Sequence, residues 1–280
     1  MTKADQYSRF NPEGSPLRMH QLRMLGMLEY LDSVCRRHGI PYWLSSGTLI
    51  GAVRHGGFIP WDDDVDIEML DADYHRLVEV LSEEAPKADY AVQTTDTDPE
   101  FLFPFGKFRD LHSYLEESNR LDSLLKYRGC YIDIFTVAPS SSRKLHRLGC
   151  KLLGTEIKFR VNHPRIKWAS AILRGMLHGV LFPAMRGITA IGAGNRLRHK
   201  IPSFFSASRD IKDIFPLSEI EFEGRRFMAP ADSDAYLRKI YGDYMRMPDP
   251  DKIQVHTSHV VLNPDSNHTC PIRPVSQSKP

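Results

Sequence analysis

Four aspartates fall within five positions of the stretch GFIPWDDDVDIEM, residues 57–69. From Asp64 onward acidic and apolar residues alternate, which predicts a strand with Asp64, Asp66 and Glu68 on an open face and apolar residues on a buried face. Carboxylates at positions i and i+2 of a strand have Cα atoms about 7 Å apart, and they repel each other unless a cation neutralises them. The pattern therefore predicts a site for Mg²⁺ or Mn²⁺ and substrate phosphates, where a phosphoryl group is transferred. Asp62 and Asp63 are expected in the turn that leads into this strand.

Two other interpretations compete for the acidic stretch. Asp62, Asp64 and Asp66 occupy positions 1, 3 and 5 of a calcium loop of the EF-hand type. Such a loop needs Gly at position 6 and Glu at position 12, where this chain has Ile67 and Asp73. A solvated acidic turn accounts for the first two aspartates, but not for acidic residues that share one face of an otherwise apolar strand.

Two further motifs support phosphoryl transfer. Gly47 and Thr48, in SSGTLIG, are expected to open a helix whose free backbone N–H groups suit a phosphate. Asp133, in YIDIF, is an acid within an apolar strand, where an unpaired carboxylate would be costly to bury. A glycine and hydroxyl turn, then an acidic pair on a strand, then a lone strand aspartate is the order of parts in the nucleotidyltransferase fold.

The elements around these motifs predict an α+β (α/β-like) domain, in which a mixed sheet is flanked by helices and carries a basic helical insertion. Apolar residues recur every three positions from about Pro16 to His38, which indicates a helix that ends at Gly39. IPYWLSS, YAVQTT, FPFGKFRD and GCYIDIFTVAP are strand candidates, DADYHRLVEVLSEEA and DSDAYLRKIYGDY are helix candidates, and FEGRRFMAP indicates a turn between short strands. The predicted divisions are a flexible amino terminus (1–15), a nucleotidyltransferase-like catalytic core (16–139), a basic helical insertion (140–200), the carboxy-terminal part of the catalytic domain (201–262) and a disordered tail (263–280).

Charge is distributed unevenly along the chain. The segment from Arg143 to Lys200 holds 13 Lys and Arg against one acid, Glu156, so it carries +12 while the remainder carries −10. A basic block predicts contact with phosphates, anionic lipid or a polyanion, although basic helices are often only solvated faces. The stretch MLHGVLFPAMRGITAIGAG is too interrupted to span a bilayer. A peripheral amphipathic helix and a plain core helix both remain open for it.

Bulk composition sets the broad class. A chain of 280 residues with 41% hydrophobic residues can bury a full core. The four cysteines, Cys35, Cys130, Cys150 and Cys270, form no CxxC or Cys/His cluster, which argues against a disulfide framework and a zinc knuckle. The first 18 residues are polar and lack an apolar core, so we expect no signal peptide and a cytoplasmic protein.

The motifs together resemble the LicD family. GTLIGAVRHGGFIPWDDDVDIEM is followed by KFRD, GCYIDIF, FEGRRFMAP and YLRKIYGDYMRMPDPDKIQVH, in family order and at family-like spacing over roughly residues 20–260. The resemblance implies a phosphotransferase of nucleotidyltransferase-like fold that moves phosphocholine from CDP-choline to bacterial surface glycans such as lipopolysaccharide, teichoic acid or capsule. Animal relatives, the fukutin group, move ribitol phosphate from CDP-ribitol in the Golgi.

The resemblance also assigns roles to individual residues. Asp64 and Asp66 match the metal-binding pair, and Asp133 matches a third carboxylate, which would be a metal ligand or the base for the acceptor hydroxyl. Trp61 is expected to pack in the turn rather than stack on cytidine, and His256 to be a packed or capping histidine. The residues implied to contact the donor and its phosphates are Gly47, Thr48, Arg54, His55, Lys107, Arg109 and Asp110, although Arg54 could instead satisfy a helix end.

The expected reaction is metal-dependent transfer of phosphocholine to a glycan hydroxyl, with release of CMP. A CDP-ribitol or CDP-glycerol donor, a true nucleotidyltransferase that releases pyrophosphate, and a non-catalytic glycan- or nucleotide-binding module remain alternatives. The expected partners are a CDP-linked donor and a glycan or lipid-linked glycan, with peripheral contact between residues 143–200 and the anionic inner face of the plasma membrane. No nucleic-acid partner is expected.

Overall fold

The computed structural model describes residues 7, 9–98, 100–117, 125–163, 165–249, 251, 253, 257–262 and 269–270. His256 and nearly all of the predicted tail lie outside these residues, as does most of the first eight.

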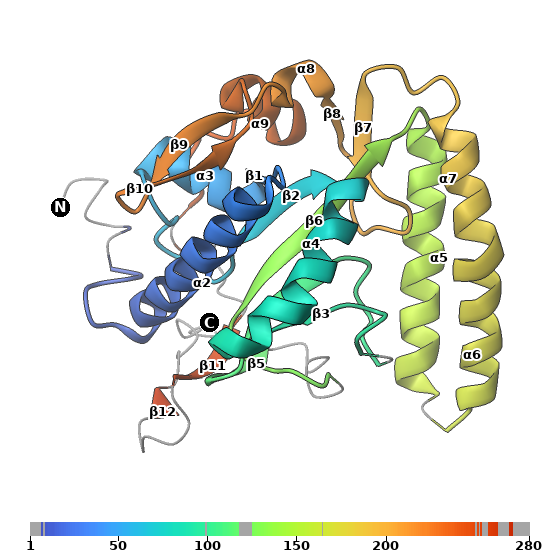
Figure 1. The fold of residues 1–280 in the computed structure, drawn as a ribbon, viewed down its shortest axis with the longest axis horizontal. Coiled ribbons are helices and arrows are strands. Elements are labelled where there is room, and N and C mark those ends of the chain that lie inside the picture. Colours follow the sequence, from blue (N-terminus) through green and yellow to red (C-terminus); the bar gives the residue numbers. More distant parts are fainter. Residues whose placement is uncertain are drawn as a thin grey trace.

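A mixed seven-stranded sheet forms the centre of the molecule, with the strand order β1-β2-β6-β4-β3 (Figure 1). The far half of β6 pairs with β7, which in turn pairs with β8. β2 and β6 run parallel, whereas the other described pairs of this sheet are antiparallel. The strands are β1 (Trp43–Leu44), β2 (Asp66–Leu70), β3 (Tyr90–Gln93), β4 (Gly106–Asp110), β6 (Tyr131–Pro139), β7 (Arg196–His199) and β8 (Ser208–Asp210).

Helices α2 (Pro16–His38) and α4 (Asp71–Glu84) cross one face of this sheet (Figure 1). Helix α2 begins where Ser15 accepts a hydrogen bond from the backbone N–H of Arg18, and it ends at Gly39 in the left-handed conformation. Its buried apolar side chains join those of the strands in one core, which includes Leu28, Leu31, Ile67 and Ile134. The mixed sheet flanked by helices confirms the predicted α+β fold.

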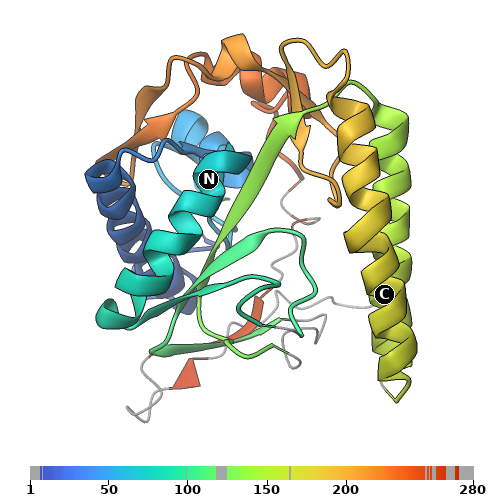
Figure 2. The same cartoon turned by 45° about the vertical axis from the view of Figure 1, so that its right-hand side comes forward.

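A helical hairpin stands beside the sheet, as Figures 1 and 2 show. Its first arm is α5 (Arg143–Asn162), and its second arm is formed by α6 (Lys167–Met176), the π turn η3 (Leu177–Leu181) and α7 (Phe182–Ala190). The two arms share a small core of Leu153, Leu177, Phe182, Met185 and Ile201. The segment 140–200, predicted as a helical insertion, is thus helical through most of Arg143–Ala190 and then returns to the sheet as β7.

Shorter elements close the ends of the domain. Helix α3 (Ser46–His55) packs beside β2, and α9 (Ser233–Tyr241) begins at Asp232, whose carboxylate caps the backbone N–H of Ala235. FEGRRFMAP forms the predicted turn between two strands, β9 and β10. The remaining elements are η1 (Ala85–Ala88), β5 (Ser113–Glu117), α8 (Ile211–Ile214), β9 (Ser218–Phe222), β10 (Arg225–Ala229), β11 (Thr257–Leu262) and β12 (Thr269–Cys270).

One feature of β2 differs from the prediction. The alternation itself is confirmed, since Val65, Ile67 and Met69 belong to the core. The opposite face is not open, because Asp66 and Glu68 are also buried. Elements distant in the sequence cover that face, and they bury Glu68 completely.

Candidate active site

The parallel pairing of β2 and β6 brings the predicted carboxylates together. Asp66 and Asp133 are partners in the strand register, and the backbone N–H of Asp133 donates to the carbonyl of Val65 at 2.8 Å. Both aspartates are buried, and Asp64 precedes the strand in a partly exposed position. Motifs 67 residues apart in the sequence therefore meet at the start of two adjacent strands.

Helix α3 begins at the same place. The hydroxyl of Thr48 accepts a hydrogen bond of 2.8 Å from the backbone N–H of Asp66. Among the described residues, no side chain caps the amino end of this helix. Ser46 there has a positive φ of 47°, a conformation that side chains rarely adopt outside functional sites. The amino end of α3 therefore retains backbone donors beside the carboxylates.

The acidic turn is anchored to α2. The amide of Gln21 donates to the carbonyl of Asp62 at 2.9 Å, and Nε2 of His20 donates to the carbonyl of Asp63 at 2.9 Å. The Asp62 carboxylate lies so close to α3 that an added Cβ at Gly47 would be 2.7 Å from Asp62 Oδ2. A glycine is required at position 47 because a side chain there would displace this carboxylate.

The crowded carboxylates resist ionisation. Burial, together with the charges of Asp63 and Asp133, raises the pKa of Asp64 to about 7. Burial and the neighbouring Asp64 raise the pKa of Asp66 and of Asp62 well above their usual range. Such shifts are typical of groups that share one site without enough positive charge.

Lys107 forms an ion pair with one of these acids. Its Nζ donates to Asp133 Oδ1 at 2.6 Å, and both side chains are buried. The same ammonium lies 3.2 Å from the ring centroid of Tyr131 and 5.1 Å from that of Phe103. Lys107 therefore reaches the centre of the site from β4, and it favours the ionised form of Asp133.

Arg54 and His55 lie at the carboxyl end of α3. Arg54 Nη1 donates to the carbonyl of Tyr244 at 2.9 Å, and its Nε donates to His55 Nε2 at 3.0 Å. Burial and the adjacent guanidinium lower the pKa of His55 to about 4, so this imidazole is neutral at pH 7. Trp61 packs against the rings of Tyr7 and Phe10, with centroids 5.3 and 5.8 Å away, as expected for a residue that packs in the turn.

Arg109 and Asp110, both predicted to contact the donor, are occupied by contacts within the protein. Arg109 is buried, and it donates to Gln93 Oε1 at 2.9 Å and to the carbonyl of Gly129 at 2.8 Å. Asp110 accepts two hydrogen bonds from Arg23 of α2, at 2.9 and 3.0 Å. These contacts fix β4 against its surroundings, and they do not bring Asp110 to the carboxylate group.

The carboxylates suit a divalent cation chemically. Within the described residues, no three His, Cys, Asp or Glu side chains already converge as metal ligands. Asp62 Oδ2 is nevertheless buried without a hydrogen-bond partner among the described residues, and burial together with neighbouring carboxylates raises the pKa values of Asp64 and Asp66. Hard oxygen donors with unneutralised negative charge are what Mg²⁺ prefers. The donor set therefore fits Mg²⁺ or Mn²⁺.

A buried ionic cluster supports the site from behind, and the sequence analysis missed its role. Glu68 accepts hydrogen bonds from Arg209 Nε at 2.9 Å, from His199 Nε2 at 2.8 Å and from the hydroxyl of Tyr236 at 2.7 Å. Burial alone would raise the pKa of Glu68, but Arg209 and His199 lower it well below its usual range. Tyr236 also bonds Ser45 at 3.0 Å, so the cluster connects β2 to the start of α3.

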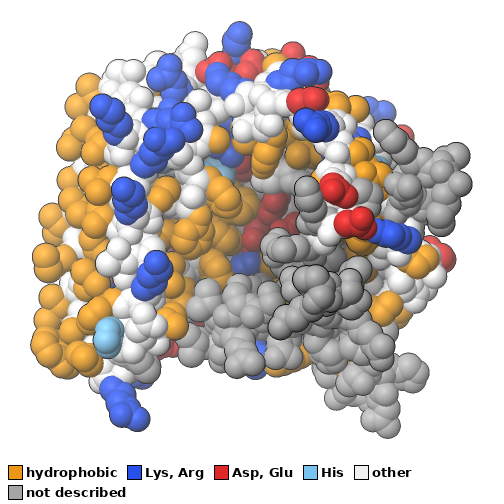
Figure 3. Space-filling model, turned by 180° about the vertical axis from the view of Figure 1, so that it is seen from behind, with side chains coloured by type: hydrophobic (Ala, Val, Ile, Leu, Met, Phe, Trp, Pro, Cys, Tyr) orange, Lys and Arg blue, Asp and Glu red, His pale blue; other side chains and the backbone are white. Residues whose placement is uncertain are grey.

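A second group that the sequence analysis missed is aromatic. The rings of Phe105 and Phe135 have centroids 4.5 Å apart, and Phe135 lies two residues after Asp133 on the same face of β6. Phe204 and Phe205 are exposed and reach this pair from the loop after β7. We call Phe103, Phe105, Phe135, Phe204 and Phe205 the phenylalanine cluster. Seen from behind, the molecule has a hollow that contains acidic side chains and has hydrophobic side chains beside it (Figure 3).

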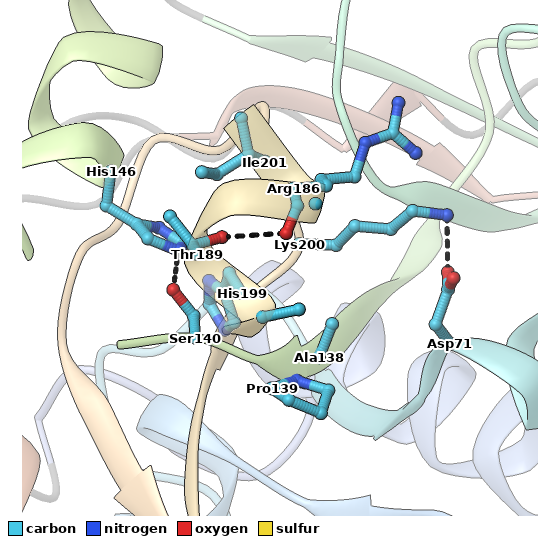
Figure 4. A pocket seen from close by; sticks show the side chains of 12 residues that line it. Asp71, Ala138, Pro139, Ser140, His146, Arg186, Thr189, His199, Lys200 and Ile201 are labelled. Atoms are coloured by element: carbon cyan, nitrogen blue, oxygen red, sulfur yellow. Dashed lines mark hydrogen bonds and ion pairs between the residues drawn. The ribbon is translucent and has the colours of Figure 1, made fainter. Parts of the chain in front are cut away.

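A cavity of about 330 Å³ lies between the end of β6 and α7 (Figure 4). Lys200 and Arg186 line it, and Lys200 Nζ donates to Asp71 Oδ1 at 2.7 Å. Both basic residues also line a neighbouring cavity of about 150 Å³, which extends to Phe103 and Phe105. Asp71 lines both cavities as well, and together they form a polar path from the phenylalanine cluster toward the helical hairpin.

The site coincides with a known domain. Residues 39–144 match the family described as LicD/FKTN/FKRP, nucleotidyltransferase domain, and this range contains all three predicted catalytic aspartates. This part of the chain therefore resembles the nucleotidyltransferase domain of the LicD family.

Individual relatives support the assignment. The chain is 28% identical over 269 residues to the lipopolysaccharide cholinephosphotransferase LicD of Haemophilus influenzae, a match that covers 86% of this chain and 95% of that protein. It is 53% identical over 38 residues to the human ribitol 5-phosphate transferase FKRP, covering 14% of this chain and 8% of that protein. A match to the mouse ribitol-5-phosphate transferase FKTN is 43% identical over 59 residues, or 21% of this chain and 13% of that protein. The chain is thus similar to phosphotransferases that act on glycans.

Proposed function

We propose that this protein is a metal-dependent phosphotransferase that moves phosphocholine from CDP-choline to a hydroxyl of a bacterial cell-surface glycan and releases CMP. The observation that carries the proposal is the register of Asp66 with Asp133 on adjacent parallel strands, next to Asp64 and the amino end of α3. Lipopolysaccharide, teichoic acid and capsule are the glycan classes considered, and the likeness to a lipopolysaccharide cholinephosphotransferase favours the first.

Asp64, Asp66 and Asp133 would hold Mg²⁺ or Mn²⁺ in this proposal. The bound cation would neutralise the donor pyrophosphate and the charge that builds on the departing CMP. Thr48 and Gly47 present backbone donors from α3 to the phosphates, and Lys107 supplies a positive charge beside Asp133. These groups surround the point at which the donor's distal phosphorus would be placed.

Asp133 also takes the role of proton acceptor. The acceptor hydroxyl forms a bond to the distal phosphorus while the bond from that phosphorus to the bridging oxygen breaks, so that CMP leaves. The proton of the hydroxyl passes to Asp133, which Lys107 keeps ionised until the acceptor binds. The product is a phosphodiester between choline and the glycan.

The phenylalanine cluster favours a choline head group over ribitol or glycerol. Quaternary ammonium groups bind to aromatic faces by cation–π attraction, whereas an alditol would need hydrogen-bond partners. Rings of this cluster already accept a cation, since Lys107 Nζ lies 5.1 Å from the centroid of Phe103 and 5.5 Å from that of Phe105. The cluster adjoins Asp133 through Phe135, so a choline group bound there would remain next to the reacting phosphorus.

The acceptor would approach along the polar path formed by the two cavities. Arg186 provides positive charge there, which suits a phosphorylated or lipid-linked glycan, whereas Lys200 is paired with Asp71. We place the reaction in the cytoplasm. Arg54, Arg109 and Asp110 would act at a greater distance, because their side chains are engaged by protein groups.

A donor panel tests the proposal. Purified protein is incubated with Mg²⁺, glycan extract and one of CDP-choline, CDP-ribitol or CDP-glycerol, and the released nucleotide is measured. We expect CMP with CDP-choline, dependent on both metal and glycan. CMP only with an alditol donor would reassign the head group, and pyrophosphate from a nucleoside triphosphate would indicate a nucleotidyltransferase. A thermal shift with CDP-choline without turnover would instead indicate a binding module.

A further inference from the structure

The second arm of the helical hairpin exposes a continuous row of apolar side chains. Three of them are among the most exposed large hydrophobic residues of the described chain: Trp168 is 70% exposed, Val180 is 70% and Ile191 is 77%. The row repeats at four-residue intervals along α6 and η3 and continues in α7 and at the residue just after it, so its members lie near one side of the arm. We call it the apolar face: Trp168, Ile172, Met176, Val180, Ile188 and Ile191.

The residues exposed between these side chains are small or apolar. Ala171, Gly175, Gly179, Ala184 and Gly187 are exposed, and they add no charge to the face. Monomeric soluble proteins rarely expose apolar patches beyond a few hundred Å² unless the patch binds something. Figure 3 shows hydrophobic side chains covering this edge of the molecule. We therefore expect the apolar face to bind a partner with an apolar interior.

Basic side chains flank the apolar face. Helix α5 exposes Lys144, Arg147, Lys151 and Lys158 at intervals of three, four and seven residues, which form a row along the first arm. In Figure 3 a column of Lys and Arg side chains runs beside the hydrophobic edge. The surface thus pairs an apolar strip with a positively charged strip.

Negative charge is missing from the exposed surface of the described part of this segment. Its one acid, Glu156, is 3% exposed and accepts from His178 at 2.8 Å inside the hairpin. An anionic surface with an apolar interior would match both strips at once. A second copy of this chain would match the apolar strip but would bring another row of bases close to the first.

We infer that the apolar face and the α5 bases form a docking surface for an anionic lipid bilayer. The hairpin would lie along the interface with the apolar face among the acyl chains and the bases on lipid phosphates. Trp168, near the start of α6, would be placed at the headgroup level, where tryptophan is favoured. Contact of this kind is peripheral, and no helix in the described part of the chain is long and apolar enough to cross a bilayer. The inference does not depend on the proposed reaction.

Vesicle flotation of the full chain tests the inference. Wild-type protein is expected to float with vesicles of phosphatidylcholine and phosphatidylglycerol, and to bind vesicles of phosphatidylcholine alone at least tenfold more weakly at about 0.1 M salt. Serine substitutions at Trp168, Met176 and Val180 remove part of the apolar face, and we expect them to lower partitioning at least tenfold.

Matched charge reversals separate local contact from net charge. Lys144→Glu, Arg147→Glu and Lys151→Glu together change the charge of α5, whereas Lys87→Glu, Lys212→Glu and Arg246→Glu change it equally at exposed sites elsewhere. The α5 variant should lose at least tenfold in partitioning, and the control should stay within about twofold of wild type. Equal losses in both variants, or wild-type flotation of the α5 variant, would overturn the assignment.

Trp168 provides a second readout that does not depend on charge. Quenching by brominated lipids should be strong in wild-type protein and absent in Trp168→Phe, because Trp43 is fully buried and Trp61 packs in the acidic turn. Sedimentation without lipid tests for a second copy on the same face. A wild-type dimer that the serine variant converts to monomer would assign the apolar face to self-association and refute lipid docking.

Discussion

Replacing Asp64 with asparagine should stabilise the metal-free protein. The pKa of Asp64 is raised from 3.8 to about 7 by burial and by the charges of Asp63 and Asp133. A shift of one pKa unit corresponds to about 1.4 kcal/mol. Above pH 7, ionised Asp64 therefore lowers the free energy of unfolding by at most about 4 kcal/mol. Because the side chain is partly exposed and solvent screens its charge, we expect Asp64→Asn to raise the free energy of unfolding by roughly half of that limit, about 2 kcal/mol.

The sign of the pH dependence follows from linkage. A carboxyl whose pKa is raised by folding binds its proton more tightly in the folded state, so its ionisation opposes folding. The penalty is absent below about pH 4, grows between about pH 4 and 7, and is complete above pH 7. Metal-free wild-type protein should lose stability across this window, and Asp64→Asn should not share that part of the loss.

Thermal and urea unfolding in EDTA at pH 4.5 and pH 8 measure the effect. At pH 8 the melting temperature of Asp64→Asn should exceed that of wild type by roughly 4–8 °C, and the two should nearly coincide at pH 4.5. Glu83→Gln, which removes an exposed carboxylate from α4, serves as the control and should melt like wild type at both pH values. Added Mg²⁺ should stabilise wild type more than the variant. If Asp64→Asn melts at or below wild type at pH 8, or if its advantage does not change with pH, the carboxylates do not repel one another as argued.

Three other substitutions, the last with a matched control, test separate features of the site and the fold. Phe105→Ala should raise the KM for CDP-choline about tenfold in steady-state assays while changing the KM for CDP-ribitol little, because only choline is held by cation–π attraction; equal changes for both donors would remove the choline assignment. Glu68→Ala should lower the free energy of unfolding, measured in urea, by about 3–5 kcal/mol, because Arg209 is left buried without its carboxylate. A decrease below about 1 kcal/mol would show that the cluster is not structurally important. Gly51→Ala should lower the free energy of unfolding by at least about 2 kcal/mol, since its Cβ would lie 2.4 Å from the carbonyl oxygen of Gly57. Gly26→Ala, in the open middle of α2, should raise the free energy of unfolding by about 0.5–1 kcal/mol. Similar unfolding midpoints for the two glycine variants would contradict the close approach of α3 to the loop after it.

The placement of the candidate catalytic carboxylates could be predicted because it depends on local pattern and family order. The alternation after Asp64 predicted the strand and its apolar face. In the structure, the parallel pairing of β2 with β6 places Asp133 beside Asp66. Thr48 was likewise expected near the acids, and its hydroxyl bonds the backbone of Asp66.

The covered face of β2 could not be predicted, because its partners come from far along the chain. Arg209 and Tyr236 follow Glu68 by 141 and 168 residues, and no local pattern signals that they pair with it. The same holds for Phe204 and Phe205, whose neighbours in the phenylalanine cluster are set by the return of β7 to the sheet. An acidic residue on the polar side of an alternating strand is therefore predicted to be exposed unless its distant counter-ions are known.

The charged residues of β4 show that a sequence motif does not reveal the role of each of its residues. The sequence K-x-R-D contains three ionisable groups in four positions, yet only Lys107 reaches the catalytic aspartates. Arg109 is bound to Gln93 and Gly129, and Asp110 is bound to Arg23 on α2. A motif can specify that charged residues are needed without indicating which of them meet the substrate and which fix the strand.

Release of CMP by the aspartate variants tests whether the carboxylates of β2 and β6 carry out the transfer. Wild type, Asp66→Asn, Asp133→Asn and Glu83→Gln are incubated with Mg²⁺, radiolabelled CDP-choline and glycan acceptor, and CMP is measured together with label on the glycan. The account predicts equal amounts of CMP and glycan-bound label for wild type and Glu83→Gln. It predicts at least a hundredfold loss for Asp66→Asn and Asp133→Asn, which should remain folded by circular dichroism. Wild-type rates of transfer in either folded aspartate variant would contradict a phosphotransfer centre built on β2 and β6.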